Sequence, residues 1–586
     1  MPSLPTFSSN KSSENLIVSI WMIFCFLTLI YKLGEIPPYH ADENFYVESS
    51  LRMVESGDYI TPVYHEKKRF AKPILYYWMV VSSYKVFGVS LASARLPSVV
   101  FGTLSIGLVF LLGCRLFDSR VGLFAAFILP SIYLHFQIAR WATTDMALGF
   151  FILLSFYYFT LLFKSSFQSN TYACLFYIAM GLGFMVKGPP AILIPGLTII
   201  GFLIATKQRS LFAELHLGKG FLILLIIILP WFSAMLLMHG EEFKNHIVGN
   251  EIKNRLVHDI PFSFYYFVVL LRYQLPWSIF FLCSFLTQLG FFSYTRKNGM
   301  TLAEQVKEFG KNVGKNIKQL FEEVNQPIAF CYLWILVCLI LFTLLRIEHS
   351  RYMLPGCPPL ALIVARMFVE VEKNSGQQKI FGFNFSRITS ASLFLIFSVL
   401  ASIGIFLMGA VSILSFLLPA VGIFAVVSLV LNARVESIQK MVVSMAIALV
   451  LIFASISGDV LPFSNKYPMK KFANKLNEEK FKGPIAVYQL GSHRARLGIL
   501  TGRMVTMVNS PEEVETLAES GRRFYLVIKE TEFKKHFSQL NLNITSEDQI
   551  RKKSRTKLIS FSDLLDVKKM REKINLTETV YFVSNN

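Results

Sequence analysis

Charged residues are scarce in this sequence, where only 16% of 586 residues are Asp, Glu, Lys or Arg. Hydrophobic residues make up 53%, and the mean hydropathy is +0.50. A soluble domain carries about 25% charged residues, so this balance excludes an ordinary soluble protein. The composition predicts an α-helical polytopic membrane protein, because helices satisfy their own backbone hydrogen bonds in lipid.

Acidic residues are few compared with basic ones, 38 against 58, which gives a formal net charge of +20. A basic patch would indicate nucleic-acid binding. Here the basic residues lie mainly in short segments between apolar runs, where they set membrane orientation and contact anionic lipid. We therefore expect membrane lipid as a partner and no nucleic acid.

None of the seven cysteines forms a CxxC pair of the kind that holds a metal. All of them lie in or beside apolar runs and behave as small core hydrophobes. The first apolar run also lacks a small-residue cleavage site, so we predict an uncleaved anchor there.

Apolar runs long enough to cross a bilayer recur up to about residue 460. The stretch 73–88 is shorter, begins at Pro73 and carries Lys85, which favours a helix in the interface over a further span. We predict about thirteen membrane helices in a domain covering residues 1–462, near residues 14–33, 92–114, 120–138, 145–164, 171–186, 188–206, 219–239, 263–292, 327–345, 354–369, 388–408, 411–432 and 440–459.

Loop charge predicts which motifs share a face. With the N-terminus inside and 73–88 not crossing, the basic loops fall on the cytoplasmic side. The opposite face then carries the first outer loop, 34–91 with its interfacial helices, and the motifs "YHADENFYVE", "RWATTD", "VKGPP" and "RIEHSRY".

The composition becomes mixed and charged after Asp459. Short β-rich runs such as "PIAVYQL" and "RFYLVIK" alternate with polar helical patterns, which predicts a small α/β domain at 463–586 outside the membrane, on the periplasmic side. It has no phosphate loop or metal motif, so we expect a lid or docking role for it.

Several motifs carry a family resemblance: "ADENFYVESSLRMVESGDYITP", "KRFAKPILYYW", "ARWATTDMALGFF", "MVKGPPAILIP" and "HSRYMLPGCPPLALIVA". In this order they resemble those of polyprenyl-phosphate-sugar glycosyltransferases, above all the lipid A aminoarabinose transferase group, with protein O-mannosyltransferases as more distant relatives. The resemblance covers roughly residues 14–370. It implies a GT-C fold and a lipid-linked sugar donor.

Three acidic residues of these motifs are candidate catalytic groups. Asp42 matches the acid at the family's reaction centre, where it would accept a proton from an acceptor hydroxyl or orient a substrate. Asp145 matches the second essential acid, and Glu43 adjoins the first. Each also stands at a predicted helix start, where capping or an interaction with the helix dipole is the alternative role.

Basic side chains on the same predicted face could hold the donor phosphate through charge-assisted hydrogen bonds. Snorkelling to the interface is their alternative role. Tyr46, one turn after Asp42, is a candidate substrate contact or an interfacial aromatic residue. The basic candidates are Lys72, Lys187, Arg255 and Arg351.

The sequence departs from the aminoarabinose transferases at three positions. The resemblance implies an arginine where this chain has Phe45, and a metal-site-like Glu and His where it has Ala71 and Ile252. Neither Ala71 nor Ile252 can ligate a metal, so we expect no metal cofactor bound in that manner. The less favoured alternative is a new metal site built from His65, His246, His258 and His349.

These observations lead to one main hypothesis, an inverting GT-C glycosyltransferase of the inner membrane with its active site on the periplasmic side. It would use an undecaprenyl-phosphate-linked sugar donor and modify lipid A or another envelope glycan. A protein O-mannosyltransferase is the alternative enzyme. A flippase for lipid-linked sugars would place ionisable groups near the bilayer midplane, whereas here they cluster at one interface. A scaffold that works through its tail alone is a further alternative.

Overall fold

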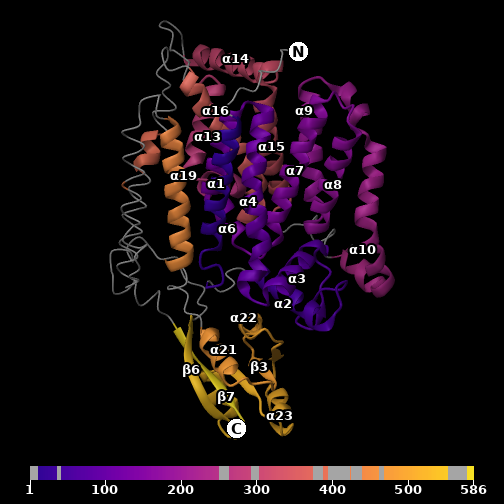
Figure 1. Cartoon of the computed structure of the whole chain (residues 1–586), viewed down its shortest axis with the longest axis vertical. Coiled ribbons are helices and arrows are strands. Elements are labelled where there is room, and N and C mark those ends of the chain that lie inside the picture. The colour runs from indigo at the N-terminus through magenta and orange to yellow at the C-terminus, as the bar shows by residue number, and fades with distance from the viewer. Residues whose placement is uncertain are drawn as a thin grey trace.

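Long apolar helices pack side by side into a bundle, and a small sheet lies beyond one end of it (Figure 1). The structure is a computed structural model. It describes residues 11–35, 41–247, 249, 263–291, 302–373, 387–392, 423, 438–460, 468–551 and 577–585.

Seven described helices are long and apolar enough to cross a membrane, or up to nine if each bent pair counts as one span. This confirms the predicted fold class, while the number thirteen stays a prediction because 393–422 and 424–437 lie outside the described residues. The bundle contains α1 (Lys11–Ile30), α4 (Leu91–Leu116), α5 (Ser119–Ile128), α6 (Tyr133–Ala139), α7 (Thr144–Lys164), α8 (Asn170–Lys187), α9 (Pro190–Ala205), α10 (Leu217–Asn245), α12 (Tyr265–Arg272), α13 (Trp277–Gln288), α15 (Gln326–Leu344), α16 (Cys357–Lys373) and α19 (Ile438–Ser455).

Two runs that we predicted as single straight spans are bent pairs. The first, predicted at 120–138, contains α5, the short η1 (Leu129–Ser131) and α6, with a bend of 64°. The second, predicted at 263–292, contains α12 and α13, with a bend of 111°. Pro130 lies in η1, and Pro276 directly precedes α13. Proline lacks a backbone N–H and clashes with the preceding turn, so it breaks the helix at both places.

The first outer loop folds at the end of the bundle that faces the sheet (Figure 1). It consists of α2 (Ala41–Ser56), a hairpin of β1 (Val63–Tyr64) and β2 (Lys67–Lys68), and α3 (Leu75–Phe87). At 13 residues, α3 is shorter than the roughly 20 that a span requires. It packs against α2 and α4 and leaves Val86 and Phe87 exposed, as a helix in the interface would.

The helix α14 (Leu302–Leu320) lies at the other end of the bundle (Figure 1). Its sequence, LAEQVKEFGKNVGKNIKQL, belongs to the basic stretch that loop charge assigned to the cytoplasmic side. The acidic α2 and this basic helix therefore occupy opposite ends, which agrees with the separation of motifs that the sequence predicts.

The C-terminal region is a five-stranded sheet in the order β4-β3-β5-β7-β6, with parallel pairing around β3 and antiparallel pairing around β7. Alternate side chains of β3 enter two cores, Ile485 and Val487 on one face and Ala486 and Tyr488 on the other. The elements are α21 (Pro468–Glu478), β3 (Ile485–Tyr488), α22 (Gly491–Thr501), β4 (Thr506–Val508), α23 (Pro511–Glu519), β5 (Tyr525–Lys529), α24 (Glu530–Glu532), η8 (Phe533–Phe537), β6 (Asn543–Arg551) and β7 (Thr577–Ser584).

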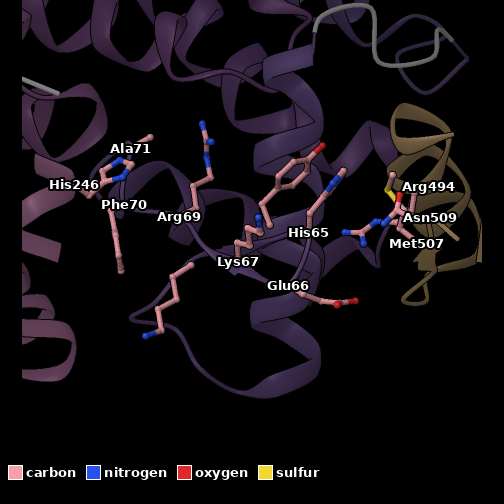
Figure 2. Close-up of a pocket in the computed structure, with 12 residues that line it drawn as sticks. His65, Glu66, Lys67, Arg69, Phe70, Ala71, His246, Arg494, Met507 and Asn509 are labelled. Atoms are coloured by element: carbon pink, nitrogen blue, oxygen red, sulfur yellow. The ribbon is translucent and has the colours of Figure 1, made fainter. Parts of the chain in front are cut away.

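This region docks on the outer loop through α22, which packs against α2. Buried Arg494 forms an ion pair with buried Glu48 of α2. His65 of the hairpin lies beside the same carboxylate, with its Nε2 3.8 Å from Glu48 Oε2. Figure 2 shows this junction, with His65 and Arg494 facing each other. At the edge of the contact, Lys470 Nζ lies 2.9 Å from Glu35 Oε2.

Candidate active site

Two helix ends bring a buried acid and a buried base together. Asp145 lies in the first turn of α7, and Lys187 lies in the last turn of α8. Because α7 and α8 are consecutive and antiparallel, the start of one adjoins the end of the other. Both positions also suit the helix dipoles, which favour acids at N-termini and bases at C-termini. Lys187 forms an ion pair with Asp145 in the structure.

Arg351 connects this pair to Asp42. It lies in η5 (Ser350–Gly356), just before α16, and its Nε is 3.4 Å from Asp145 Oδ2. Another nitrogen of the same guanidinium, Nη2, pairs with Asp42 at the start of α2. The result is one chain of alternating charges, Asp42, Arg351, Asp145 and Lys187, which we call the ionic chain. Tyr352 flanks it, with Lys187 Nζ 4.3 Å from the ring centroid.

Only one end of the ionic chain is accessible. The Asp42 side chain keeps 36% of its accessible surface, whereas those of Asp145, Arg351 and Lys187 keep 4%, 6% and 9%. A substrate that approaches the chain therefore meets the Asp42 carboxylate first.

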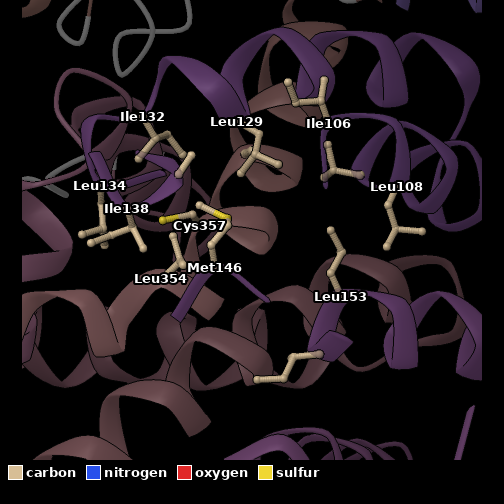
Figure 3. Close-up of a cluster of buried hydrophobic side chains, with 14 of the residues drawn as sticks. Ile106, Leu108, Leu129, Ile132, Leu134, Ile138, Met146, Leu153, Leu354 and Cys357 are labelled. Atoms are coloured by element: carbon tan, nitrogen blue, oxygen red, sulfur yellow. The ribbon is translucent and has the colours of Figure 1, made fainter. Parts of the chain in front are cut away.

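A buried apolar cluster lies next to the two middle members of the ionic chain, Asp145 and Arg351 (Figure 3). Met146 follows Asp145 directly, and Leu354 and Cys357 follow Arg351 by one turn or two; all three are fully or almost fully buried. Cores of this kind are packed as densely as crystals, so the adjoining charged side chains have little freedom to move. The described apolar partners in Figure 3 include Leu129, Ile132, Leu134 and Ile138.

Glu43, the neighbour of Asp42, is fully buried and accepts hydrogen bonds at both carboxylate oxygens. It accepts two hydrogen bonds from Arg95, at 2.6 Å from Nε and 2.9 Å from Nη2, and one from the backbone N–H of Ala142 at 2.9 Å. Arg95 also donates to the carbonyl oxygen of Leu33 at 2.6 Å. The pair thus joins α1, α2, α4 and the "RWATTD" loop, which favours a positioning role for Glu43 over the catalytic role that the resemblance allows.

An arginine packs over Phe45, the position where the resemblance implies an arginine. Arg69 lies with its guanidinium carbon 3.8 Å from the Phe45 ring centroid and donates from Nε to the Tyr77 hydroxyl at 3.1 Å. Tyr46 is buried between Tyr76 and Tyr77, with both ring centroids 5.2 Å away. Burial raises the pKa of Tyr46 well above its ordinary value, so this phenol is neutral and cannot serve as a base.

The remaining predicted residues differ in how much the structure says of them. Lys72 is partly buried and donates from Nζ to the carbonyl oxygen of Ala71 at 2.8 Å. Arg255 and Ile252 lie outside the described residues. In the part of the chain that the structure describes, no group of three or more His, Cys, Asp or Glu side chains is arranged to hold a metal ion. His258 is among the positions that this statement does not cover.

Sequence reasoning missed two buried arginines that build the frame of the site. Arg95 holds Glu43, and Arg140 donates to the carbonyl oxygens of Leu29 at 2.7 Å and Tyr31 at 2.8 Å, at the end of α1. The sequence could have indicated them, because burying a charged residue within or beside an apolar run costs free energy unless it has partners.

Comparisons with known proteins agree with this architecture. The family described as dolichyl-phosphate-mannose-protein mannosyltransferase matches residues 71–233. An undecaprenyl phosphate-alpha-4-amino-4-deoxy-L-arabinose arabinosyl transferase of Pseudomonas paraeruginosa is 28% identical over 56% of this chain and 55% of its own length. An uncharacterized protein of Aquifex aeolicus is 25% identical over 57% of this chain and 60% of its own. The match thus spans little more than half the length of these relatives.

A solved structure extends the likeness to the whole fold. ArnT from Cupriavidus metallidurans, solved with bound undecaprenyl phosphate, superimposes with a TM-score of 0.70 and 16% identity, over 97% of this chain and 98% of that one.

The fold and the sequence matches relate this chain to the GT-C class of glycosyltransferases. It is similar in sequence to aminoarabinose transferases and in fold to ArnT.

Proposed function

We propose that this chain is an integral-membrane glycosyltransferase of the inner membrane. It moves a sugar from a polyprenyl phosphate donor, of the undecaprenyl type, to lipid A or another envelope glycan on the periplasmic face. The observation that carries the proposal is the ionic chain, which presents one accessible carboxylate beside buried cations at the end of the bundle. Its relatives named as undecaprenyl phosphate arabinosyl transferases support the donor class.

The reaction breaks the bond between the sugar C1 and the phosphate oxygen, and an acceptor oxygen forms the new bond to C1 with inversion. The proton of the acceptor hydroxyl goes to the Asp42 carboxylate, and the bonding electrons leave with the phosphate. Lys72 and Arg351 stabilise this leaving group, because cations placed in advance act strongly where water is excluded. By the resemblance, Arg255 assists them.

The buried members of the site position the reacting groups. Asp145 holds Arg351 and Lys187 in place through its two oxygens. Glu43 holds the start of α2 through Arg95, so that Asp42 is aimed at the acceptor. Tyr46 forms part of the aromatic wall behind them. Orientation and fixed charge supply the catalysis.

This mechanism uses no metal cofactor, since neither Ala71 nor Ile252 carries a ligating side chain. We expect a chelator such as EDTA to leave the rate of transfer unchanged. A loss of activity that added Zn²⁺ or Mg²⁺ restores would contradict this part of the proposal.

The test follows label from a polyprenyl-phospho-sugar through purified protein in lipid nanodiscs. We expect label in a lipid or glycan product, and a raised donor KM in Lys72→Gln. Lys85→Gln is the matched control, because this lysine packs over Tyr59, with Nζ 4.2 Å from the ring centroid, and should leave KM unchanged. Absence of label in any acceptor, with donor flipped across the bilayer instead, would overturn the enzyme assignment.

A protein O-mannosyltransferase is the second candidate, and the family match to residues 71–233 favours it. In that case Asp42 would deprotonate a serine or threonine hydroxyl. Label in a protein fraction, and none in lipid, would select this candidate over the first.

A further inference from the structure

A pocket of about 460 Å³ lies where the first outer loop meets α10 and the C-terminal sheet region (Figure 2). The hairpin residues form its floor, with His246 on one side and Arg494, Met507 and Asn509 on the other. The residues from the sheet region lie more than 400 positions beyond the hairpin in the sequence, so the pocket exists only because the two parts of the chain dock.

Basic groups dominate the lining of this junction pocket. Lys67, Lys68, Arg69 and Arg494 line it, and Glu66 is the one acid among the lining residues that the structure describes. Lys68 is held by Glu242 of α10 at 2.8 Å, whereas Lys67 is exposed on β2. An excess of positive charge in a concave site attracts anions and concentrates them there.

Two buried nitrogens of the junction pocket have unused hydrogen-bonding capacity. Among the residues that the structure describes, Arg494 Nε and His65 Nε2 have no hydrogen-bond partner. The Arg494 side chain is 2% exposed. A buried polar atom without a partner is costly, so a ligand that pairs with it is favoured.

His65 is neutral in this environment. Burial, together with the positive charges of Arg494 and Arg52, lowers the pKa of His65 to about 4. A neutral imidazole at neutral pH can donate one hydrogen bond to a ligand oxygen.

The junction pocket adjoins the proposed reaction centre. Arg69 lines the pocket and also packs over Phe45, three residues after Asp42. Ala71 lines the pocket as well, and Lys72 follows it. A molecule whose charged group sits in this pocket therefore lies beside Asp42 without competing for the ionic chain.

We propose that the junction pocket is a second anion site, which takes a phosphate or carboxylate carried by the head group of the acceptor lipid. The inference rests on the proposed function and deepens it. The donor phosphate uses the cations of the bundle, while the acceptor is recognised jointly by the hairpin and by Arg494 and Asn509 of the sheet region.

A second basic pocket, of about 640 Å³, serves as the internal control. It is lined entirely by the sheet region and its flanks, among them Lys482, Arg503, Arg522 and Arg523. Since no residue of the outer loop lines it, it offers comparable charge without the adjacent reaction centre.

The experiment measures binding of diphosphoryl lipid A to the full chain in nanodiscs of zwitterionic lipid. Its dephosphorylated form and soluble glucosamine 1-phosphate are the comparison ligands. Lys67→Glu and Asn509→Asp place negative charge in the junction pocket at exposed positions, so the docking pair Arg494 and Glu48 is left intact. Lys482→Glu makes the same change in charge at the control pocket as Lys67→Glu makes at the junction pocket.

We expect Lys67→Glu and Asn509→Asp to weaken binding of the diphosphoryl lipid by about tenfold each, the effect of losing one charge-assisted hydrogen bond. Lys482→Glu should bind as wild type does, and the dephosphorylated lipid should bind weakly to all. Equal weakening by Lys482→Glu, or equal affinity for the dephosphorylated form, would overturn the proposal. Equal affinity for glucosamine 1-phosphate would overturn the assignment to a lipid-borne group.

Binding and transfer are separate readouts. If wild type binds the diphosphoryl lipid through Lys67 and Asn509 but transfers no sugar to any acceptor, the anion site stands and the proposed function fails. If transfer proceeds at equal acceptor KM in wild type, Lys67→Glu and Asn509→Asp, the proposed function stands and the anion site fails.

Discussion

Asp42 and Glu43 are adjacent carboxylates in the first turn of one helix, yet they lie in opposite environments. Glu43 is fully buried, and its oxygens are taken by Arg95 and the Ala142 amide. The Asp42 side chain keeps 36% of its surface and pairs with Arg351, which it shares with Asp145. Successive residues of a helix point about 100° apart, so one faces the protein while the other faces the substrate side.

Under the proposed function, this difference lets one short motif combine stability with reactivity. The Glu43–Arg95 ion pair is buried away from any ligand, but it holds the helix rigidly. The neighbouring carboxylate can then be exposed and still be accurately placed. Substitutions at the two positions should therefore have different consequences.

The largest expected effect is that of Asp42→Asn on turnover. Removing a general base lowers the rate of transfer by about 10²–10⁴-fold. Because Asp42 is partly exposed, the midpoint of thermal unfolding should stay close to that of wild type. Initial rates with labelled donor, measured beside thermal unfolding of the same preparation, test both parts. Wild-type turnover in this variant would remove Asp42 from the chemistry.

Glu43→Gln should show the reverse pattern, because its main effect should be a loss of folding stability. It removes the buried carboxylate that pairs with the Arg95 guanidinium, which costs about 3–5 kcal/mol of folding free energy. Thermal unfolding in detergent is the measurement. The double variant Glu43→Gln with Arg95→Met removes the orphaned charge and should recover part of the loss. A stable but inactive Glu43→Gln protein would assign chemistry to Glu43 after all.

Arg351→Lys should have an intermediate effect, since the ammonium group of lysine cannot pair with two carboxylates through a planar fork as arginine does. We expect the donor KM to rise by about tenfold, because one charge-assisted hydrogen bond is lost. The change in kcat should be smaller. Steady-state kinetics against donor concentration separate the two constants. Arg366→Lys is a matched control, because this arginine pairs with Glu370 one turn away on α16. Unchanged donor KM in Arg351→Lys would exclude Arg351 from phosphate binding.

The smallest expected effect is on the pH dependence of folding stability, through His65. Its pKa in the folded protein is about 4, below the ordinary value near 6.5. The folded state therefore binds fewer protons than the unfolded state, and stability falls as the pH drops from about 6.5 towards 4. In His65→Gln this part of the decline should be absent. Unfolding midpoints of both proteins at several pH values give the difference, and parallel curves would contradict the assignment.

Part of the site could be predicted from the sequence because it depends on helix ends. Asp145 and Lys187 flank two consecutive apolar runs, so an antiparallel pair of helices brings them together without further information. The faces assigned by loop charge then group Asp42 and Arg351 with them. The helical fold class followed from composition alone.

The remainder depends on tertiary packing that no local pattern encodes. Nothing near Arg95 indicates that its partner is Glu43 rather than another acid of the outer loop. The pairing of Glu48 with Arg494 joins residues from the two ends of the chain and arises only when the sheet region docks. The prolines that cause the bends, Pro130 and Pro276, are visible in the sequence, but the length of the apolar runs alone predicted straight spans.

Because Lys187 must reach Asp145, the length of α8 determines whether the lysine lies in the site. One residue inserted between Asn170 and Lys187 would rotate the lysine by about 100° and advance it by about 1.5 Å. The buried ammonium would then point away from Asp145, and Arg351 would lose its shared counter-ion. Natural variants of this chain should therefore tolerate insertions in the 165–169 turn far better than within the 18 residues of α8.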